Sequence, residues 1–217
     1  MLRAFMFDMD GVIIDSEPIQ MMSINEVLSQ WGVQLSEEEY IPLVGRRLSD
    51  DYAYMKKVYH LPLEYPEFFV QKTEAYGRLI RKNGVEMPGL SELLNRLDRY
   101  GVKKSVASGS ICEDIELVLN LLKVRDRFDY ITGGDEVSIG KPDPEIYLAA
   151  ARKVGVSPSE CVALEDTYYG LAAAKDAGMK CIAFPHRYTR MQDFSRADAV
   201  IESLDDITEQ LLDSLGK

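Results

Sequence analysis

The sequence contains little of what several classes of protein require. Its 217 residues include only three cysteines, two histidines and one tryptophan. The cysteines are odd in number and widely spaced, without a C-x-x-C pair, so we expect neither a disulfide framework nor a cysteine zinc site. Positive charge is also scarce, because 25 Lys and Arg face 36 Asp and Glu, which gives a net charge of −11. Nucleic acid and anionic membranes are therefore not expected partners.

Long hydrophobic runs are missing as well. No apolar stretch approaches the roughly 20 residues of a membrane-spanning helix. A carboxylate at Asp8 interrupts the N-terminus before the apolar region of a signal peptide could form. The sequence predicts a soluble, cytoplasmic protein with reduced thiols, and we expect a monomer.

Short apolar segments alternate with helical patterns along most of the chain. Segments that are apolar on both faces predict buried strands of a parallel sheet, and they lie at 4–7, 104–107, 128–132, 161–164 and 180–184. Helical patterns lie between the later strands, at 114–122, 144–154 and 169–177. This alternation predicts an α/β fold, a Rossmann-like parallel sheet with helices on both faces.

Residues 15–84 break this rhythm and contain no convincing strand. Apolar residues recur with helical spacing from Ile24 to Trp31. Ser36 and Glu39 have the spacing of a capping box at the start of a further helix. The segment therefore predicts an all-helical insert.

The insert divides the chain into two domains. We expect residues 1–14 and 85–217 to form the α/β core and residues 15–84 to form a helical cap. The two connections between them would act as hinges, so that the cap could close over the core.

Polar residues follow four of the expected strands at the point where each strand ends. In open α/β sheets, ligands bind at the carboxyl ends of the strands. Ordinary turns would not require four polar groups at this one edge, so we expect a functional site there. Its candidate residues are Asp8 and Asp10 after the first strand, Ser108, Gly109 and Ser110 after the second, Lys141 after the third, and Glu165 and Asp166 after the fourth.

Asp8 and Asp10 are two carboxylates separated by one residue. Taken alone, such a pair is more often a polar turn after a buried strand. An EF-hand calcium loop has glycine at its sixth position, whereas Gly11 is the fourth residue here. Two neighbouring carboxylates at the end of a buried strand repel each other unless a cation or a proton lies between them. Mg²⁺ is the natural candidate because it prefers oxygen ligands.

The other groups each have an ordinary structural alternative. Ser108 and Ser110 could cap the helix that follows them, although free amides and a hydroxyl at a helix start also bind phosphate. Lys141 could be a solvated loop lysine, and Asp166 could be the cap of the next helix. The coincidence of these groups with Glu165 at one edge favours a site.

Together these segments resemble the four motifs of the haloacid dehalogenase superfamily, in its phosphatase and β-phosphoglucomutase-like branch with a helical cap. The matching segments span almost the whole chain; they are Phe7-Asp8-Met9-Asp10-Gly11, Ser108-Gly109-Ser110, Gly140-Lys141-Pro142-Asp143-Pro144 and Leu164-Glu165-Asp166. The resemblance implies a Mg²⁺-dependent phosphatase that hydrolyses a small phosphorylated metabolite, such as a sugar or polyol phosphate, through an aspartyl-phosphate intermediate.

The resemblance also implies the catalytic residues. Asp8 would be the nucleophile, and Asp10 would protonate the leaving oxygen and then take a proton from water. Lys141 would neutralise the phosphoryl group and the nucleophile. Mg²⁺ would be held by Asp8, by the backbone carbonyl of Asp10 and by Asp166, with Glu165 as a ligand or a partner of the ligands.

Phosphate contacts follow from the same resemblance. Ser108, the amide of Gly109, and Ser110 would hold phosphate oxygens in the core. On the cap, Arg46 and Arg47 are candidates for contacts to a second phosphate, or they are solvated helix-end residues.

Three other functions are alternatives to a phosphatase. Mutases of this branch carry a histidine where this chain has Gln20, and a Lys-Gly-x-Ser-Arg run where it reads Val44-Gly45-Arg46-Arg47-Leu48. These departures favour a phosphatase over the alternative, a β-phosphoglucomutase-type mutase. Asp10 disfavours a dehalogenase, which needs no acid for a leaving oxygen. Asp10 and the large insert also disfavour a non-catalytic phosphate-binding module.

Overall fold

The computed structural model describes all 217 residues. The chain divides into two compact units, which are residues 1–15 with 85–217, and residues 16–84. We call them the core unit and the helical unit and describe each by itself.

The core unit contains a six-stranded parallel sheet in the order β3-β2-β1-β4-β5-β6. Every residue of the two central strands is buried, as expected for a sheet that is covered on both faces. The predicted α/β fold is therefore confirmed. The strands are β1 (Ala4–Phe7), β2 (Lys103–Ala107), β3 (Tyr130–Thr132), β4 (Cys161–Glu165), β5 (Lys180–Ala183) and β6 (Ala199–Val200).

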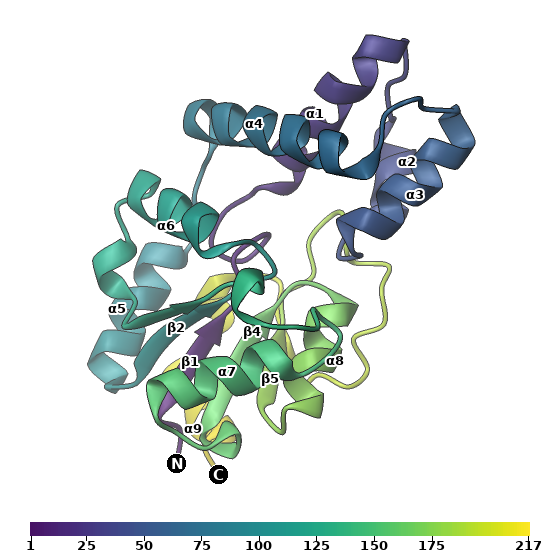
Figure 1. Cartoon of the computed structure of the whole chain (residues 1–217). Helices are drawn as coiled ribbons and strands as arrows, with labels where there is room; N and C mark the ends of the chain where they lie inside the picture. The colour runs from purple at the N-terminus through teal and green to yellow at the C-terminus, as the bar shows by residue number, and fades with distance from the viewer. The chain divides into compact units, whose positions relative to one another are not determined.

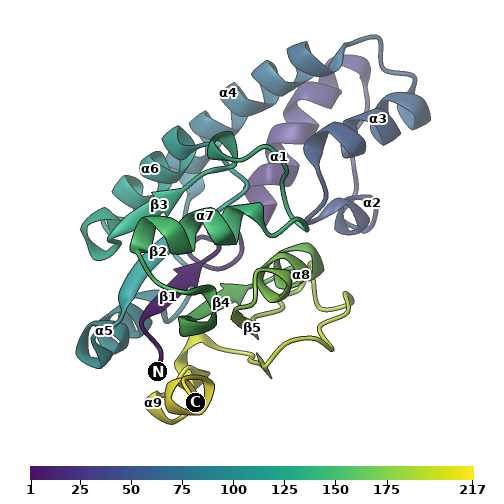
Figure 2. The same cartoon turned by 60° about the horizontal axis from the view of Figure 1, so that its bottom comes forward.

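Helices cover the sheet from two sides. α7 packs on β1, β2 and β3 and contacts α8, which packs on β4 and β5, so these two helices share a face (Figure 1). α5 and α9 lie on the opposite side (Figure 2), where Tyr100 donates a hydrogen bond to Asp213 at 2.7 Å. The helices of this unit are α5 (Leu90–Tyr100), α6 (Cys112–Leu121), α7 (Glu145–Val154), α8 (Tyr168–Asp176) and α9 (Glu209–Leu215).

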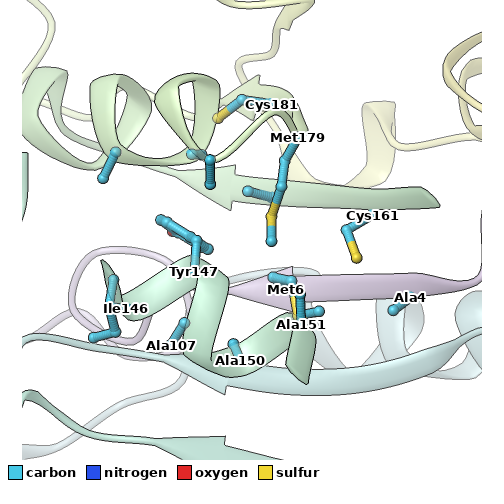
Figure 3. Packing of buried hydrophobic residues seen from close by; sticks show 14 of the residues in the cluster. Ala4, Met6, Ala107, Ile146, Tyr147, Ala150, Ala151, Cys161, Met179 and Cys181 are labelled. Atoms are coloured by element: carbon cyan, nitrogen blue, oxygen red, sulfur yellow. The ribbon is translucent and has the colours of Figure 1, made fainter. Parts of the chain in front are cut away.

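Small side chains let α7 approach the sheet closely. Ala150 and Ala151 of the helix belong to the same buried cluster as Met6 and Cys161 of the central strands (Figure 3). Close packing of this kind holds a helix in a fixed position over the strands. Tyr147 is the large member of the cluster. Its ring lies in the apolar core, and its hydroxyl donates a hydrogen bond to Glu165 at the polar edge of the sheet.

The helical unit contains no strand. α1 packs along α4, and the rings of Tyr52 and Phe68 stack with centroids 4.3 Å apart. The predicted capping box at Ser36 and Glu39 is confirmed at the start of α2. The helices are α1 (Glu17–Leu28), α2 (Glu37–Tyr40), α3 (Leu48–Tyr59) and α4 (Tyr65–Asn83). In the whole chain, no helix combines the length and the apolar character that a membrane crossing needs.

The structure differs from the sequence prediction at the edges of the sheet. The strand expected from Phe128 begins at Tyr130, because residues 125–127 form a 3₁₀ turn that delays it. β6 has two residues and was not predicted. A strand this short has too few positions to show a period.

Candidate active site

The carboxyl ends of neighbouring strands are aligned in register. The Asp8 amide, just after β1, donates a hydrogen bond of 3.0 Å to the Leu164 carbonyl of β4. The Ser108 amide, just after β2, donates one of 3.1 Å to the Thr132 carbonyl of β3. These bonds extend the parallel ladder beyond the strands. The first side chains after the strands therefore lie at one edge, as the sequence predicted.

Lys141 is the centre of the charged network at this edge. Its Nζ atom lies 2.7 Å from Asp8 Oδ1 and 2.6 Å from Glu165 Oε1. The loop that carries it is closed just before α7, where the Glu145 amide donates to Asp143 Oδ1 at 3.0 Å. The Lys141 side chain is only 12% exposed, so it is not a solvated loop lysine.

Acidic groups outnumber basic groups in this cluster. Burial raises the pKa of Asp8 to about 7, although Lys141 opposes the shift. Burial also raises the pKa values of Glu165 and Asp166. Burial lowers the pKa of Lys141, but the carboxylates of Asp8 and Glu165 outweigh it and raise that pKa overall. A single lysine thus lies among three buried carboxyl groups, so a further cation at this site would be electrostatically favourable.

The donor atoms fit a divalent cation. Asp8, Glu165 and Asp166 each offer a carboxylate oxygen, and these atoms lie within 4.8 Å of one another. Glu165 Oε2 and Asp166 Oδ1 are buried and have no hydrogen-bond partner. Buried acceptors without a partner are costly. An oxygen-binding cation such as Mg²⁺ would satisfy both the atoms and the charge.

Asp10 and the segment after β2 lie next to each other. Ser110 Oγ donates to Asp10 Oδ2 at 3.3 Å, and the Ser110 amide donates to Ser108 Oγ at 3.1 Å. Gly109 lies between the two serines in open space, since a Cβ atom there would meet nothing within 4 Å. The N-cap of α6 is Ile111. The alternative that Ser108 or Ser110 only caps this helix is therefore wrong.

Glu165 is fixed by groups that the sequence analysis did not identify. The buried hydroxyl of Tyr147 donates to Glu165 Oε1, the same oxygen that Lys141 contacts. A Cβ atom at Gly170 would overlap the Glu165 carboxylate. A glycine inside a helix is unfavourable without such a reason, so Gly170 was a usable signal, whereas Tyr147 looks like any core aromatic.

His186 is the second partner that sequence reasoning missed. The His186 side chain is only 15% exposed, and its Nε2 atom lies 2.8 Å from Asp166 Oδ2. It follows β5, so its place after a strand was the available signal. The N-cap of α8 is Thr167, whose side chain accepts from the Gly170 amide. Asp166 is therefore not the cap of that helix.

The predicted residues of the insert belong to the helical unit. Arg46 and Arg47 are exposed and precede α3. Arg46 Nε lies 3.2 Å from Asp51 Oδ1. Gln20 on α1 accepts a hydrogen bond from the buried Lys72 on α4.

A family model described as "Haloacid dehalogenase-like hydrolase" matches residues 5–184, which include every predicted core motif. The chain belongs to this family. The predicted superfamily membership is thereby confirmed.

Other members of the family resemble the whole chain. It is 32% identical to hexitol phosphatase B of Escherichia coli over 220 residues, with 99% of this chain and 97% of the relative covered. A structure of a CbbY variant from Rhodobacter sphaeroides with xylulose-1,5-bisphosphate has a TM-score of 0.84 and 31% identity, with 94% and 95% covered. A putative β-phosphoglucomutase from Thermotoga maritima has a TM-score of 0.78 and 26% identity, with 98% and 99% covered.

Proposed function

We propose that this haloacid dehalogenase-like hydrolase is a Mg²⁺-dependent phosphatase that releases inorganic phosphate from a small sugar or polyol phosphate. One observation carries the proposal. Asp8 lies at the end of the central strand, paired with Lys141 and within the three-carboxylate cluster, while Asp10 stands two residues further on beside Ser110.

Asp8 and Asp10 have complementary roles in this reaction. The Asp8 carboxylate attacks the phosphorus, the bond from phosphorus to the sugar oxygen breaks, and Asp10 gives its proton to that oxygen. Asp10 then takes a proton from water, and the water oxygen attacks the aspartyl-phosphate. Inorganic phosphate leaves and Asp8 is restored as a carboxylate.

Lys141 and the segment after β2 hold the charge of the phosphoryl group. Lys141 already contacts Asp8 at 2.7 Å, so a phosphoryl group on Asp8 would form next to its ammonium. Ser108, the Gly109 amide and Ser110 would bind the remaining oxygens. Positioned donors of this kind supply most of the catalysis in phosphoryl transfer.

Asp8, Glu165 and Asp166 would hold Mg²⁺, together with the Asp10 backbone carbonyl. Bound there, Mg²⁺ supplies positive charge between an anionic nucleophile and an anionic substrate. The orphaned oxygens of Glu165 and Asp166 support this assignment. Tyr147 and Lys141 hold the other oxygen of Glu165 and so fix its orientation.

The substrate class rests on the relatives and on the helical unit. Hexitol phosphatase B is named for a polyol phosphate, and the CbbY structure contains a sugar bisphosphate. The helical unit would be the cap that supplies specificity, with Arg46 and Arg47 as phosphate contacts. We expect the enzyme to act as a cytoplasmic monomer, without a nucleic-acid or membrane partner.

The mutase alternative receives less support from this chain. A mutase keeps the phosphoryl group on the enzyme and returns it to another hydroxyl, whereas a phosphatase admits water. The neutral amide of Gln20 stands where mutases have histidine, and it accepts a hydrogen bond from Lys72 instead of exchanging a proton.

The test is phosphate release from a panel of sugar and polyol phosphates, measured with Mg²⁺ and with EDTA. Asp8→Asn is the control, because it keeps the shape of the side chain and removes the nucleophile. The panel includes β-glucose 1-phosphate with a trace of glucose 1,6-bisphosphate, and isomer formation is followed in parallel. We expect release that needs both Mg²⁺ and Asp8. Isomer formation with little release would establish the mutase, and release unaffected by Asp8→Asn would reject the mechanism.

A further inference from the structure

His186 is held in place by its own loop. Its amide donates to Thr189 Oγ1 at 3.1 Å, and its carbonyl accepts from the amides of Thr189 and Arg190 at 3.0 and 2.9 Å. Thr189 is completely buried. This turn after β5 fixes the backbone of His186, so the ring has a defined starting point.

The hydrogen bonds of the ring determine which nitrogen carries the proton. The Tyr188 amide donates to His186 Nδ1 at 3.3 Å, so Nδ1 is an acceptor. In this tautomer the hydrogen is on Nε2, which then donates to Asp166 Oδ2 at 2.8 Å. The ring also packs edge-on against Tyr188, with centroids 5.8 Å apart. His186 thus offers Asp166 a single, oriented N–H group.

This contact separates the two oxygens of Asp166. Oδ2 accepts from His186, whereas Oδ1 is buried without a hydrogen-bond partner. The backbone of Gly11 packs against both His186 and Asp166. A Cβ atom at Gly11 would lie 2.6 Å from His186 Nε2 and would overlap Asp166 Oδ2. The carboxylate is therefore clamped between an imidazole and the loop after β1.

We propose that His186 is a positioning residue for the cation: it holds Asp166 Oδ2 and thereby presents Oδ1 to the Mg²⁺ bound by Asp8, Glu165 and Asp166. The proposal rests on the proposed function, because it needs a cation at the carboxylate cluster. It adds a partner from the turn after β5, a strand that none of the motif residues follow. Partners that orient metal ligands usually change metal affinity about 10- to 100-fold when they are removed.

The experiment measures Mg²⁺ affinity directly, by isothermal titration of Mg²⁺ into metal-free, full-length protein without substrate. We expect His186→Ala to raise the dissociation constant about 10-fold or more. His186→Gln, whose amide nitrogen can also donate to Asp166, should recover much of that loss. His60→Asn is the matched control: His60 lies in the helical unit with φ of 54°, a conformation that asparagine tolerates, and its variant should bind Mg²⁺ as the wild type does.

Kinetics give a second readout. The Mg²⁺ concentration for half-maximal activity should rise in His186→Ala, while kcat at saturating Mg²⁺ stays within a few-fold of the wild type. Thermal melting of each variant reports whether the fold is intact.

Each outcome has a distinct meaning. A His186→Ala protein that melts earlier but binds Mg²⁺ with wild-type affinity would show a purely structural role and overturn the inference. Equal losses in His186→Gln and His186→Ala would reject the donor role of the ring. Wild-type protein that binds no Mg²⁺, yet releases phosphate in EDTA, would overturn both the inference and the metal dependence of the proposed function. Normal Mg²⁺ binding without any phosphate release would reject the proposed function alone.

Discussion

The two units of the chain bury charged side chains in different ways. In the core unit, the buried carboxyl groups gather at one edge of the sheet around Lys141, whereas the buried Lys104 on β2 pairs with Asp98 elsewhere. In the helical unit, the buried charges are dispersed among different helices, and each has a local partner: Glu17 accepts from Tyr40, Lys72 donates to Gln20, and Asp51 lies beside Arg46.

This difference separates charge kept for chemistry from charge kept for structure. A dispersed charge with its own partner contributes mainly to the stability of its neighbourhood. A cluster whose charges do not cancel is costly for the empty protein and gains when an ion or a substrate binds. Carboxyl groups with strongly raised pKa values that cluster at one edge of the sheet therefore indicate a functional site. The same groups dispersed through the fold would not.

The contrast between the units is tested most strongly by substituting one lysine in each, Lys141 and Lys72. Lys141→Met removes the cation that contacts Asp8 and Glu165, and we expect kcat to fall by about 10²- to 10³-fold or more. Lys72→Met removes a lysine that donates to Gln20 and lies 4.8 Å from the ring of Tyr76, so we expect a lower melting temperature with kcat within a few-fold of the wild type.

Initial rates at saturating Mg²⁺, with melting curves for both variants, check this pair. A Lys141→Met enzyme with more than a tenth of wild-type turnover would contradict the role given to Lys141. A loss of kcat in Lys72→Met as large as that in Lys141→Met would break the contrast between the units.

Two glycines with almost the same backbone angle provide a sharper pair. Gly11 in the core unit has φ of 73° and is crowded by Asp166 and His186, while Gly32 in the helical unit has φ of 70° and nothing within 4 Å of a Cβ atom. Gly32→Ala should cost only the left-handed backbone penalty, about 1–2 kcal/mol. Gly11→Ala adds a steric overlap with the Asp166 carboxylate.

We expect Gly11→Ala to unfold at clearly lower denaturant concentration than Gly32→Ala and to bind Mg²⁺ more weakly. Urea unfolding and Mg²⁺ titration of both variants measure these effects. Equal unfolding midpoints would show that the loop after β1 moves freely enough to admit a methyl group, and the clamp on Asp166 would then be loose.

The sequence predicted the parts of the site that a strand carries directly. Asp8 and Glu165 come immediately after buried apolar runs, Asp166 follows Glu165, and parallel strands bring their ends to one edge. The position of Lys141 followed from its motif. These residues depend on local pattern and sheet topology, both of which one sequence contains.

The partners of those residues depend on tertiary structure and were not predictable in this way. The sequence places His186 after a strand, but its contact with Asp166 depends on the conformation of the turn after β5, which no period or spacing encodes. Tyr147 has a core position and a polar contact at once, and the sequence indicates only the first. The contact between Arg46 and Asp51 depends likewise on how the segment before α3 turns.

A buried acid in the helical unit predicts a pH effect on stability. Burial raises the pKa of Asp51 from its ordinary 3.8 to about 7, although Arg46 opposes the shift. The folded protein therefore holds this proton more tightly than the unfolded chain, and the resulting stabilisation, full below pH 4, is lost as the pH rises through 7. The whole shift corresponds to about 4 kcal/mol at most.

Asp51→Asn mimics the protonated side chain, so it should raise the melting temperature at pH 8 and have little effect at pH 4.5. Thermal melts at the two pH values test this, with Asp50→Asn, an exposed neighbour on the same helix, as the control. The same change at both pH values in Asp51→Asn would mean that Arg46 keeps Asp51 ionised in the fold.

The smallest effect concerns two tyrosines that each donate to a buried glutamate. Tyr40 contacts Glu17 at 2.5 Å in the helical unit, and Tyr147 contacts Glu165 in the core unit. Removing one hydroxyl should cost about 1–2 kcal/mol, and less for Tyr147→Phe, because Lys141 still donates to the same Glu165 oxygen. Urea unfolding of the two phenylalanine variants measures the difference. If Tyr147→Phe were the more destabilising change, the lysine would not compensate for the lost hydroxyl, and the core network would depend on every one of its members.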